Sequence, residues 1–138
     1  MYLICHDIDM RAFAEDIYFL ISTPEGLNKW WTVRSEGILA QNEEYQFYFS
    51  DEYDWKGEIL EFTPNESISY FMTQADSDWK GTMLSFELIH KEDHYYTLRF
   101  EHRNWKEINS HFRRTSYCWA LYLNTLKEHA ESLFKLKA

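Results

Sequence analysis

The pattern of hydrophobic and polar positions changes its period three times along the chain, and the first part predicts a strand followed by two short helices. Residues 2–8, YLICHDI, are typical of a strand, and Asp9 is a candidate N-cap for a helix of about three turns. Thr23, Pro24 and Glu25 then form a second helix start, with Pro at the first helical position and an acid in the first turn. The apolar positions at helical spacing are Met10, Phe13, Ala14, Ile17, Leu20 and Ile21 in the first helix, and Leu27, Trp30 and Trp31 in the second.

The middle of the chain switches to strand-like segments rich in aromatic and β-branched residues. Short turn clusters such as TPNE and HKEDH separate these segments, which favours hairpins and an antiparallel meander. The expected strands are 45–50, 55–62, 67–73, 81–89 and 95–102, with a fainter one around 36–40.

The period becomes helical again at the carboxyl end. From about Ile108 no proline interrupts the chain, and roughly seven turns of helix are expected. One face of this helix carries the apolar residues Phe112, Trp119, Leu123, Leu126, Ala130 and Leu133.

Composition narrows the class of protein. A chain of 138 residues with a formal charge of −9 fits one acidic domain spanning 1–138, and its field repels nucleic acid and anionic lipid. No apolar run approaches the ~20 residues of a membrane span, and no signal peptide is readable, so a cytoplasmic location is expected. Cys5 and Cys118 lie far apart and indicate neither a disulfide framework nor a zinc site. Aromatic residues make up 19% of the chain, which is more bulky material than its length requires.

The sequence contains no complete metal-binding or catalytic motif, so neither a cofactor nor a metal is predicted. The segment from Asp76 to Glu87 approaches a calcium loop, but Lys80 stands where an oxygen ligand is needed. His90 and His94 flank a hairpin turn, where a solvated loop is the simpler interpretation. No phosphate-binding, zinc-protease or nucleophile-elbow motif is present, and no catalytic residue is predicted.

Four segments in register carry a family resemblance. STPEGLNKWWT, WKGEILEFTPNESISYFM, GTMLSFELIHKEDHYYTLRFEH and CWALYLNTLKEH resemble motifs of the START-like (SRPBCC) superfamily, in the branch named for the activator of heat shock protein 90 ATPase. Cys118 stands where that family usually has glycine. The resemblance implies an α+β helix-grip fold, in which a curved antiparallel sheet of about six to seven strands wraps around a long C-terminal helix. Two short helices follow the first strand in this layout.

The resemblance also implies a set of functional alternatives. The first is a non-enzymatic domain that binds a small hydrophobic or amphipathic ligand between the sheet and the C-terminal helix. The second is a co-chaperone or other protein-interaction domain, and the third is a cyclase- or hydrolase-like enzyme, for which only His102 and Tyr70 are candidates. The chain is expected to be a monomer or a homodimer.

Strand alternation and helix geometry within this layout suggest which side chains line a cavity. Trp30 and Trp31 are adjacent on a helix, so one is expected in the core and the other at the mouth of a pocket, unless both plug the end of the sheet. His102 ends an inward-facing row, where it either orients a ligand or is satisfied by neighbouring groups. The expected cavity-lining residues are Trp30, Trp31, Phe47, Tyr70, Phe86, Leu98, Phe100, His102, Trp119 and Leu123.

Overall fold

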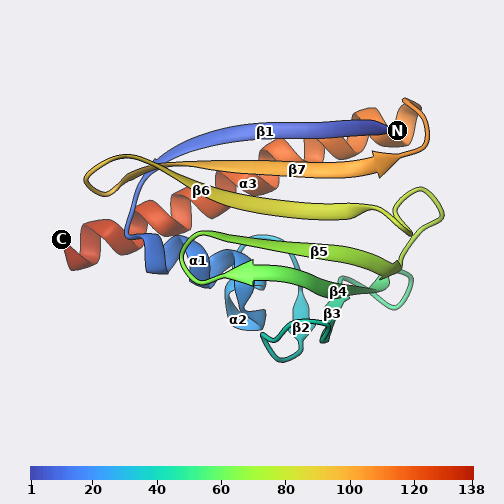
Figure 1. The fold of residues 1–138 in the computed structure, drawn as a ribbon, viewed down its shortest axis with the longest axis horizontal. Helices are drawn as coiled ribbons and strands as arrows, with labels where there is room; N and C mark the ends of the chain where they lie inside the picture. Colours follow the sequence, from blue (N-terminus) through green and yellow to red (C-terminus); the bar gives the residue numbers. More distant parts are fainter.

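A seven-stranded antiparallel sheet forms one layer of the molecule and a long helix lies along one of its faces (Figure 1). The computed structural model describes all residues 1–138. The strands are β1 (Tyr2–Arg11), β2 (Arg34–Glu36), β3 (Glu44–Tyr48), β4 (Asp54–Thr63), β5 (Ser67–Gln74), β6 (Met83–Glu92) and β7 (Tyr95–Trp105). The helices are α1 (Ala14–Ser22), α2 (Pro24–Leu27) and α3 (Ser110–Lys137).

The sheet order is β1-β7-β6-β5-β4-β3-β2, so β3 to β7 form a meander and β1 pairs with the last strand. This is the helix-grip arrangement expected from the sequence. Figure 1 shows α3 crossing behind the sheet, α1 and α2 beside the part of the sheet from β5 to β2, and the two termini at opposite ends.

The third helix is the longest element. Asn109 caps it, because its side-chain oxygen accepts a hydrogen bond from the backbone N–H of Phe112 at 2.8 Å. Its 28 residues give a length of about 42 Å at the usual rise per residue. Positions three or four apart face the sheet and are buried: Thr115, Trp119, Leu123, Leu126 and Ala130.

The first strand is longer than the sequence predicted, and Asp9 does not cap a helix. Residues 9–11 continue β1 and pair with β7, and the Thr97 hydroxyl donates to a carboxylate oxygen of Asp9 at 2.6 Å. Met10 is fully buried, and its position fits strand alternation with Ile4 as well as helical spacing. The helix therefore starts only at Ala14, with Phe13 at the N-cap. The faint strand expected around 36–40 lies instead at Arg34–Glu36.

The second helix begins as the sequence predicted. Thr23 is its N-cap and accepts a hydrogen bond from the Gly26 N–H at 3.0 Å, and Pro24 takes the first helical position. Gly26 allows α2 to press against α1, because a Cβ at this position would lie 1.9 Å from the Phe19 carbonyl oxygen.

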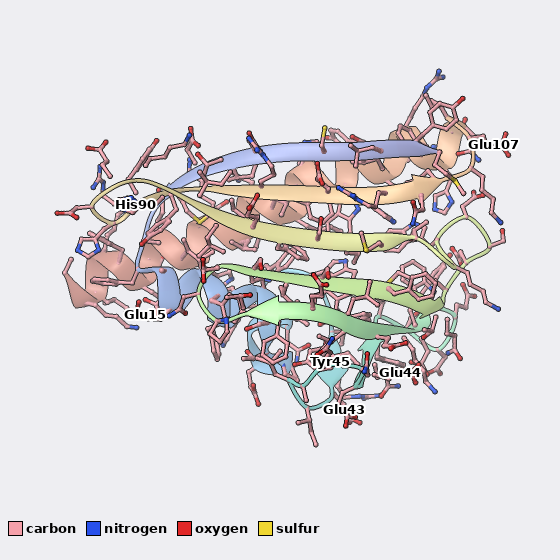
Figure 2. All side chains as sticks on the ribbon, viewed as in Figure 1. Glu15, Glu43, Glu44, Tyr45, His90 and Glu107 are labelled. Atoms are coloured by element: carbon pink, nitrogen blue, oxygen red, sulfur yellow. The ribbon has the colours of Figure 1, made fainter.

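A cluster of 26 buried hydrophobic residues fills the space between the sheet and the helices. Carboxylates lie mostly outside it: Figure 2 shows Glu15, Glu43, Glu44 and Glu107 at the periphery, and all four are exposed. The acidity of the chain is thus carried largely by a solvated surface.

Candidate functional site

A pocket opens between the amino-terminal half of α3 and the end of the sheet where β3 meets β4. Its volume is about 360 Å³, and most of its wall is aromatic. It is lined by Trp31, Phe49, Tyr53, Trp55, Asp76, Trp79, His111, Arg114, Thr115, Cys118, Trp119 and Tyr122. We call it the aromatic pocket.

Five of these side chains form a closed circuit of ring contacts. Trp31 lies 5.4 Å from Phe49 and 5.2 Å from Trp119, measured between ring centroids. Trp55 lies 5.4 Å from Phe49 and 4.7 Å from Trp79. Trp79 closes the circuit at 5.8 Å from Trp119. Such distances are typical of favourable aromatic pairs, so the rings hold one another in place.

Each ring of the circuit comes from a different part of the chain. Trp31 follows α2, Phe49 follows β3, and Trp55 lies at the start of β4. Trp79 is held in the connection between β5 and β6, where its backbone N–H donates to the Asp76 carbonyl oxygen at 2.9 Å. Trp119 projects from α3. Trp55 and Trp79 are the tryptophans of the two Asp-Trp-Lys-Gly copies in the sequence, and the fold brings them into contact.

Polar groups of the pocket come mainly from the first turns of α3. Arg114 is exposed and belongs to none of the four ion pairs of the molecule. His111 donates from Nδ1 to a carboxylate oxygen of Asp78 at 2.9 Å, which fixes its ring. Thr115 is buried at 6% exposure, and Asp76 adds one carboxylate to the lining. The pocket therefore combines an apolar wall with a small set of polar groups, as ligand sites do.

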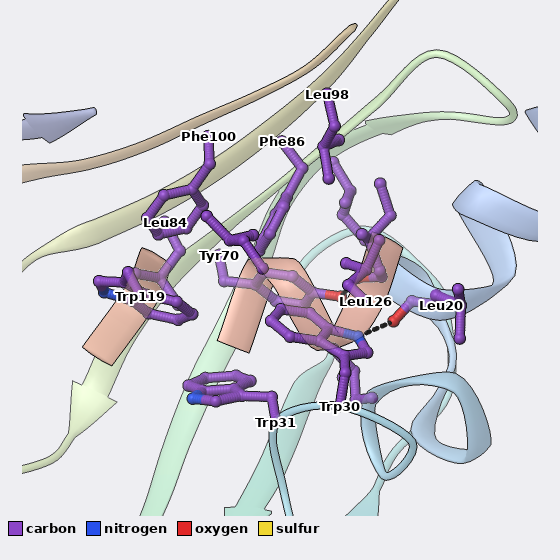
Figure 3. Packing of buried hydrophobic residues seen from close by; sticks show 14 of the residues in the cluster. Leu20, Trp30, Trp31, Tyr70, Leu84, Phe86, Leu98, Phe100, Trp119 and Leu126 are labelled. Carbon is purple, nitrogen blue, oxygen red and sulfur yellow. Dashed lines mark hydrogen bonds between the residues drawn. The ribbon is translucent and has the colours of Figure 1, made fainter. Parts of the chain in front are cut away.

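Of the ten residues expected to line a cavity, only Trp31 and Trp119 line the aromatic pocket. Figure 3 shows how the others that it labels gather in the core beside these two rings. The remaining eight are buried in the interior: Trp30, Phe47, Tyr70, Phe86, Leu98, Phe100, His102 and Leu123. Trp30 and Trp31 lie beyond the end of α2, not on it as expected, because that helix stops at Leu27. Both are buried and only Trp31 lines the pocket, and ligand contact by any of the ten residues stays a prediction.

Two of the interior residues have a structural task at the end of α1. Pro24 has no N–H to give to the Leu20 carbonyl, and the indole Nε1 of Trp30 donates to that oxygen instead, at 2.7 Å (Figure 3). The hydroxyl of Tyr70 donates to the next carbonyl, that of Ile21, at 2.6 Å. Tyr45 serves the following one, Ser22, at 2.7 Å. Three aromatic side chains thus cap the helix.

His102 is also held by structural hydrogen bonds. Its Nδ1 accepts from the Trp119 indole at 3.1 Å, so its Nε2 carries the proton and donates to the Thr82 hydroxyl at 2.8 Å. Thr82 in turn donates to the Trp79 carbonyl oxygen at 2.5 Å. Burial lowers the pKa of His102 to about 3, and proximity to His111 adds to the effect, so the ring is neutral. This chain of bonds fixes Trp79 and Trp119, two walls of the pocket.

Sequence reasoning missed most of the pocket wall. Phe49 continues the inward row of Tyr45 and Phe47, and the repeated Asp-Trp-Lys-Gly segment marks Trp55 and Trp79, so these signals were present. On α3, Thr115 belongs to the buried stripe, and the other pocket residues of this helix lie beside that stripe, on a face that separates core from solvent. The missed residues are Phe49, Tyr53, Trp55, Asp76, Trp79, His111, Arg114, Thr115, Cys118 and Tyr122.

No three His, Cys, Asp or Glu side chains are grouped closely enough to hold a metal ion. None of the three helices combines the length and the apolar character needed to cross a membrane.

Comparisons with known proteins place this architecture among the START-like, helix-grip proteins. The family described as Activator of Hsp90 ATPase homolog 1-like protein matches residues 11–131, and the chain belongs to that family. A comparison with curated proteins finds no significant match.

Solved structures agree with this assignment. The Aha1 dimer from Colwellia psychrerythraea is 29% identical, with a TM-score of 0.85 over 95% of this chain and 97% of that one. CalU16 from Micromonospora echinospora is 15% identical, with a TM-score of 0.75 over 96% of this chain and 78% of that one. Protein BH1534 of Bacillus halodurans is 17% identical, with a TM-score of 0.76 over 95% and 98% of the two chains. The last two similarities concern the fold alone.

Proposed function

We propose that the protein is a non-enzymatic START-like domain that binds a small hydrophobic or amphipathic molecule in the aromatic pocket. One observation carries the proposal: a closed circuit of five aromatic rings lines an open pocket of about 360 Å³. Ligand pockets typically measure ~300–1,000 Å³ and have apolar walls with a few polar groups.

The position of the pocket differs from a cavity in the middle of the sheet. Phe86, Phe100 and Leu123 fill that middle and are buried to 1% exposure or less. At the end near β4 the aromatic side chains are less covered: Trp55 is half-buried, and Tyr53 keeps 44% of its surface exposed. A flat apolar ligand would cover this surface, which supports a binding site there.

Indole N–H resonances provide a direct test. Six tryptophans give six signals, and four of their side chains line the pocket while those of Trp30 and Trp105 do not. We expect 2-naphthalenemethanol, a flat neutral probe, to shift signals of the four pocket tryptophans and to leave those of Trp30 and Trp105 almost unmoved. Replacing Trp55 by leucine should weaken this binding. Absence of any shift at millimolar probe, or equal shifts of all six signals, would refute the proposal.

Native mass spectrometry of freshly purified protein complements this test, because a co-purifying ligand adds mass that disappears on denaturation. An added mass identified as a lipid or an aromatic metabolite would name the natural ligand.

A second candidate function is a co-chaperone or other protein-interaction role, which family membership favours. The outer face of α3 exposes Tyr117 and Leu121, at 67% and 54%, beside the pocket residue Tyr122. Pull-down with heat shock protein 90 and an assay of its ATPase would test this role, and no stimulation at saturating protein would contradict it. The structure solved for the Colwellia protein is a dimer, so homodimer formation belongs to the same proposal and is checked by light scattering.

The enzymatic alternative has no comparable support. His102 uses both ring nitrogens in structural hydrogen bonds, and the Tyr70 hydroxyl is used at the end of α1. Neither side chain lines the pocket.

A further inference from the structure

Building on the proposed function, we infer that the aromatic pocket selects an anionic ligand: a flat aromatic or conjugated ring that bears a carboxylate. The ring would pack on the tryptophan wall, and the carboxylate would accept hydrogen bonds from Arg114 and Thr115. Two features of the pocket lead to this ligand class, namely hydrogen-bond donors without partners and an aromatic wall in the same pocket.

The donors lie together on α3. Arg114 and Thr115 are consecutive and both line the pocket. The guanidinium group of Arg114 has no acidic partner within 4.0 Å, although the chain carries 23 carboxylates against 14 basic side chains. Thr115 is 94% buried as a residue, and the indole Nε1 of Trp79, which also lines the pocket, is a buried donor without a hydrogen-bond partner. A buried N–H group is rarely left without a partner, so a ligand atom is a natural acceptor for the Trp79 indole, and the Thr115 hydroxyl is a further donor in the same pocket.

The beginning of α3 is positive in an acidic protein. Its first turn contains no Asp or Glu, whereas Arg113 and Arg114 lie within the first five residues. Cations are unfavourable at a helix N-terminus because the helix dipole is positive there, so these arginines do not stabilise the helix. A guanidinium group binds a carboxylate with two parallel hydrogen bonds, which gives Arg114 a purpose in ligand recognition.

A cationic ligand is the alternative, since tryptophan faces attract cations and Asp76 also lines the pocket. Two observations favour the anion. The donors Arg114 and Thr115 outnumber the one carboxylate, and the cation of Arg114 would repel a positive ligand. In addition, the ring plane of Trp119 is tilted by only 38° from that of Trp31 and by 27° from that of Trp79. These rings therefore resemble a surface on which a flat ligand stacks more than an aromatic cage that surrounds a cation.

Three probes with the same ring and different charge test the inference. These are 2-naphthoate, neutral 2-naphthalenemethanol and cationic 2-naphthylmethylammonium, each titrated at low salt while the indole N–H signals are followed. We expect 2-naphthoate to bind about tenfold more tightly than the alcohol, and the ammonium to bind most weakly. The advantage of 2-naphthoate should shrink as salt is added, because Arg114 is exposed.

Variants locate the source of this preference. Arg114→Gln should lower the affinity for 2-naphthoate much more than the affinity for the alcohol, so that the tenfold advantage of 2-naphthoate disappears. Arg113→Gln removes the same charge from the neighbouring residue, which does not line the pocket, and should keep most of the advantage. Thr115→Val keeps the shape of the side chain and should weaken 2-naphthoate binding more than binding of the alcohol.

The outcomes separate this inference from the proposed function. Equal affinity for 2-naphthoate and the alcohol, with shifts confined to the pocket tryptophans, would overturn the anion preference and leave ligand binding intact. Tightest binding of the ammonium would do the same and would identify Asp76 as the selecting group. If the Arg113 and Arg114 changes lower the affinity for 2-naphthoate equally, the preference comes from the overall positive charge at the start of α3. That result would overturn the inference that Arg114 binds the carboxylate. No binding of any probe would contradict both proposals.

Discussion

Acid should destabilise the protein through His102, and the structure gives the size of the effect. The ring is neutral in the folded protein because its pKa is lowered to about 3, first by burial and then by His111. In the unfolded chain the ring regains its ordinary pKa of 6.5 and takes up a proton as the pH falls below that value. The unfolded state therefore binds more protons between about pH 6.5 and pH 3, and the free energy of unfolding falls with pH across this window.

The magnitude follows from proton linkage. At about pH 5 the solution is roughly 1.5 pH units below the pKa of His102 in the unfolded chain. Each pH unit corresponds to about 1.4 kcal/mol, so the free energy of unfolding at this pH is ~2 kcal/mol lower than at about pH 7.5. Urea unfolding followed by tryptophan fluorescence at constant ionic strength measures it. Other titrating groups add to the total, so the wild-type difference alone is not decisive.

Substitution isolates the contribution of His102. His102→Gln keeps an acceptor for Trp119 and a donor for Thr82 but does not titrate, so the variant should lose ~2 kcal/mol less than wild type on going to pH 5. His90→Gln is the matched control at an exposed position and should behave like wild type. If His102→Gln shows the full wild-type loss, or if the His102 ring signals titrate near pH 6 in the folded protein, the reasoning is refuted.

Three further predictions concern buried tyrosines on or next to α1 and the contact of α1 with α2. Tyr70→Phe leaves a buried helix carbonyl without a partner and should cost ~1–3 kcal/mol in urea unfolding, whereas Tyr48→Phe, which removes a surface hydroxyl, should cost less than ~0.5 kcal/mol. Burial raises the pKa of Tyr18 and of Tyr45 to about 12, so the folded protein keeps protons that the unfolded chain loses, and the free energy of unfolding should fall as the pH rises from about 10 to about 12. Tyrosinate absorbance should therefore grow only when the protein unfolds, and ionisation of these two residues near pH 10 in the folded protein would contradict the prediction. Gly26→Ala should prevent the native α1–α2 contact, giving a large fall in melting temperature, and an unchanged melting temperature would show that the helices separate easily.

The sequence predicts the order of elements because each element has its own period. The meander follows from alternating segments and short turns, and α3 follows from one uninterrupted apolar face. The predicted end of β1 is wrong because Met10 fits both the strand period and the helix period. Only pairing with β7, which is remote in the sequence, shows that residues 9–11 belong to the strand. Thr23 and Pro24 predict the start of α2 correctly because a cap depends on neighbouring residues alone.

The pocket could not be predicted to the same degree. Periodicity tells which face of an element is buried, but it does not tell where the core ends along that element. Trp79 lies in a connection between strands, and its position depends on a bond to Thr82 and on contact with Trp55. Arg114 is typical of a solvated helix position, and only the arrangement of α3 beside β4 gives it an aromatic wall to face.

The high aromatic content is explained by two sets of side chains with different tasks. Trp30, Tyr45 and Tyr70 turn their polar atoms to the last carbonyls of α1, where Pro24 and the end of the helix leave acceptors unpaired. An aliphatic residue would fill the same space without satisfying these carbonyls, so aromatic residues with a donor are required there. This explanation does not extend to Trp55. Its ring makes contacts in the circuit, but its indole N–H makes no hydrogen bond that would require an aromatic residue at this position. Trp55 and the other rings of the circuit have a different task, which is to form the wall of the pocket.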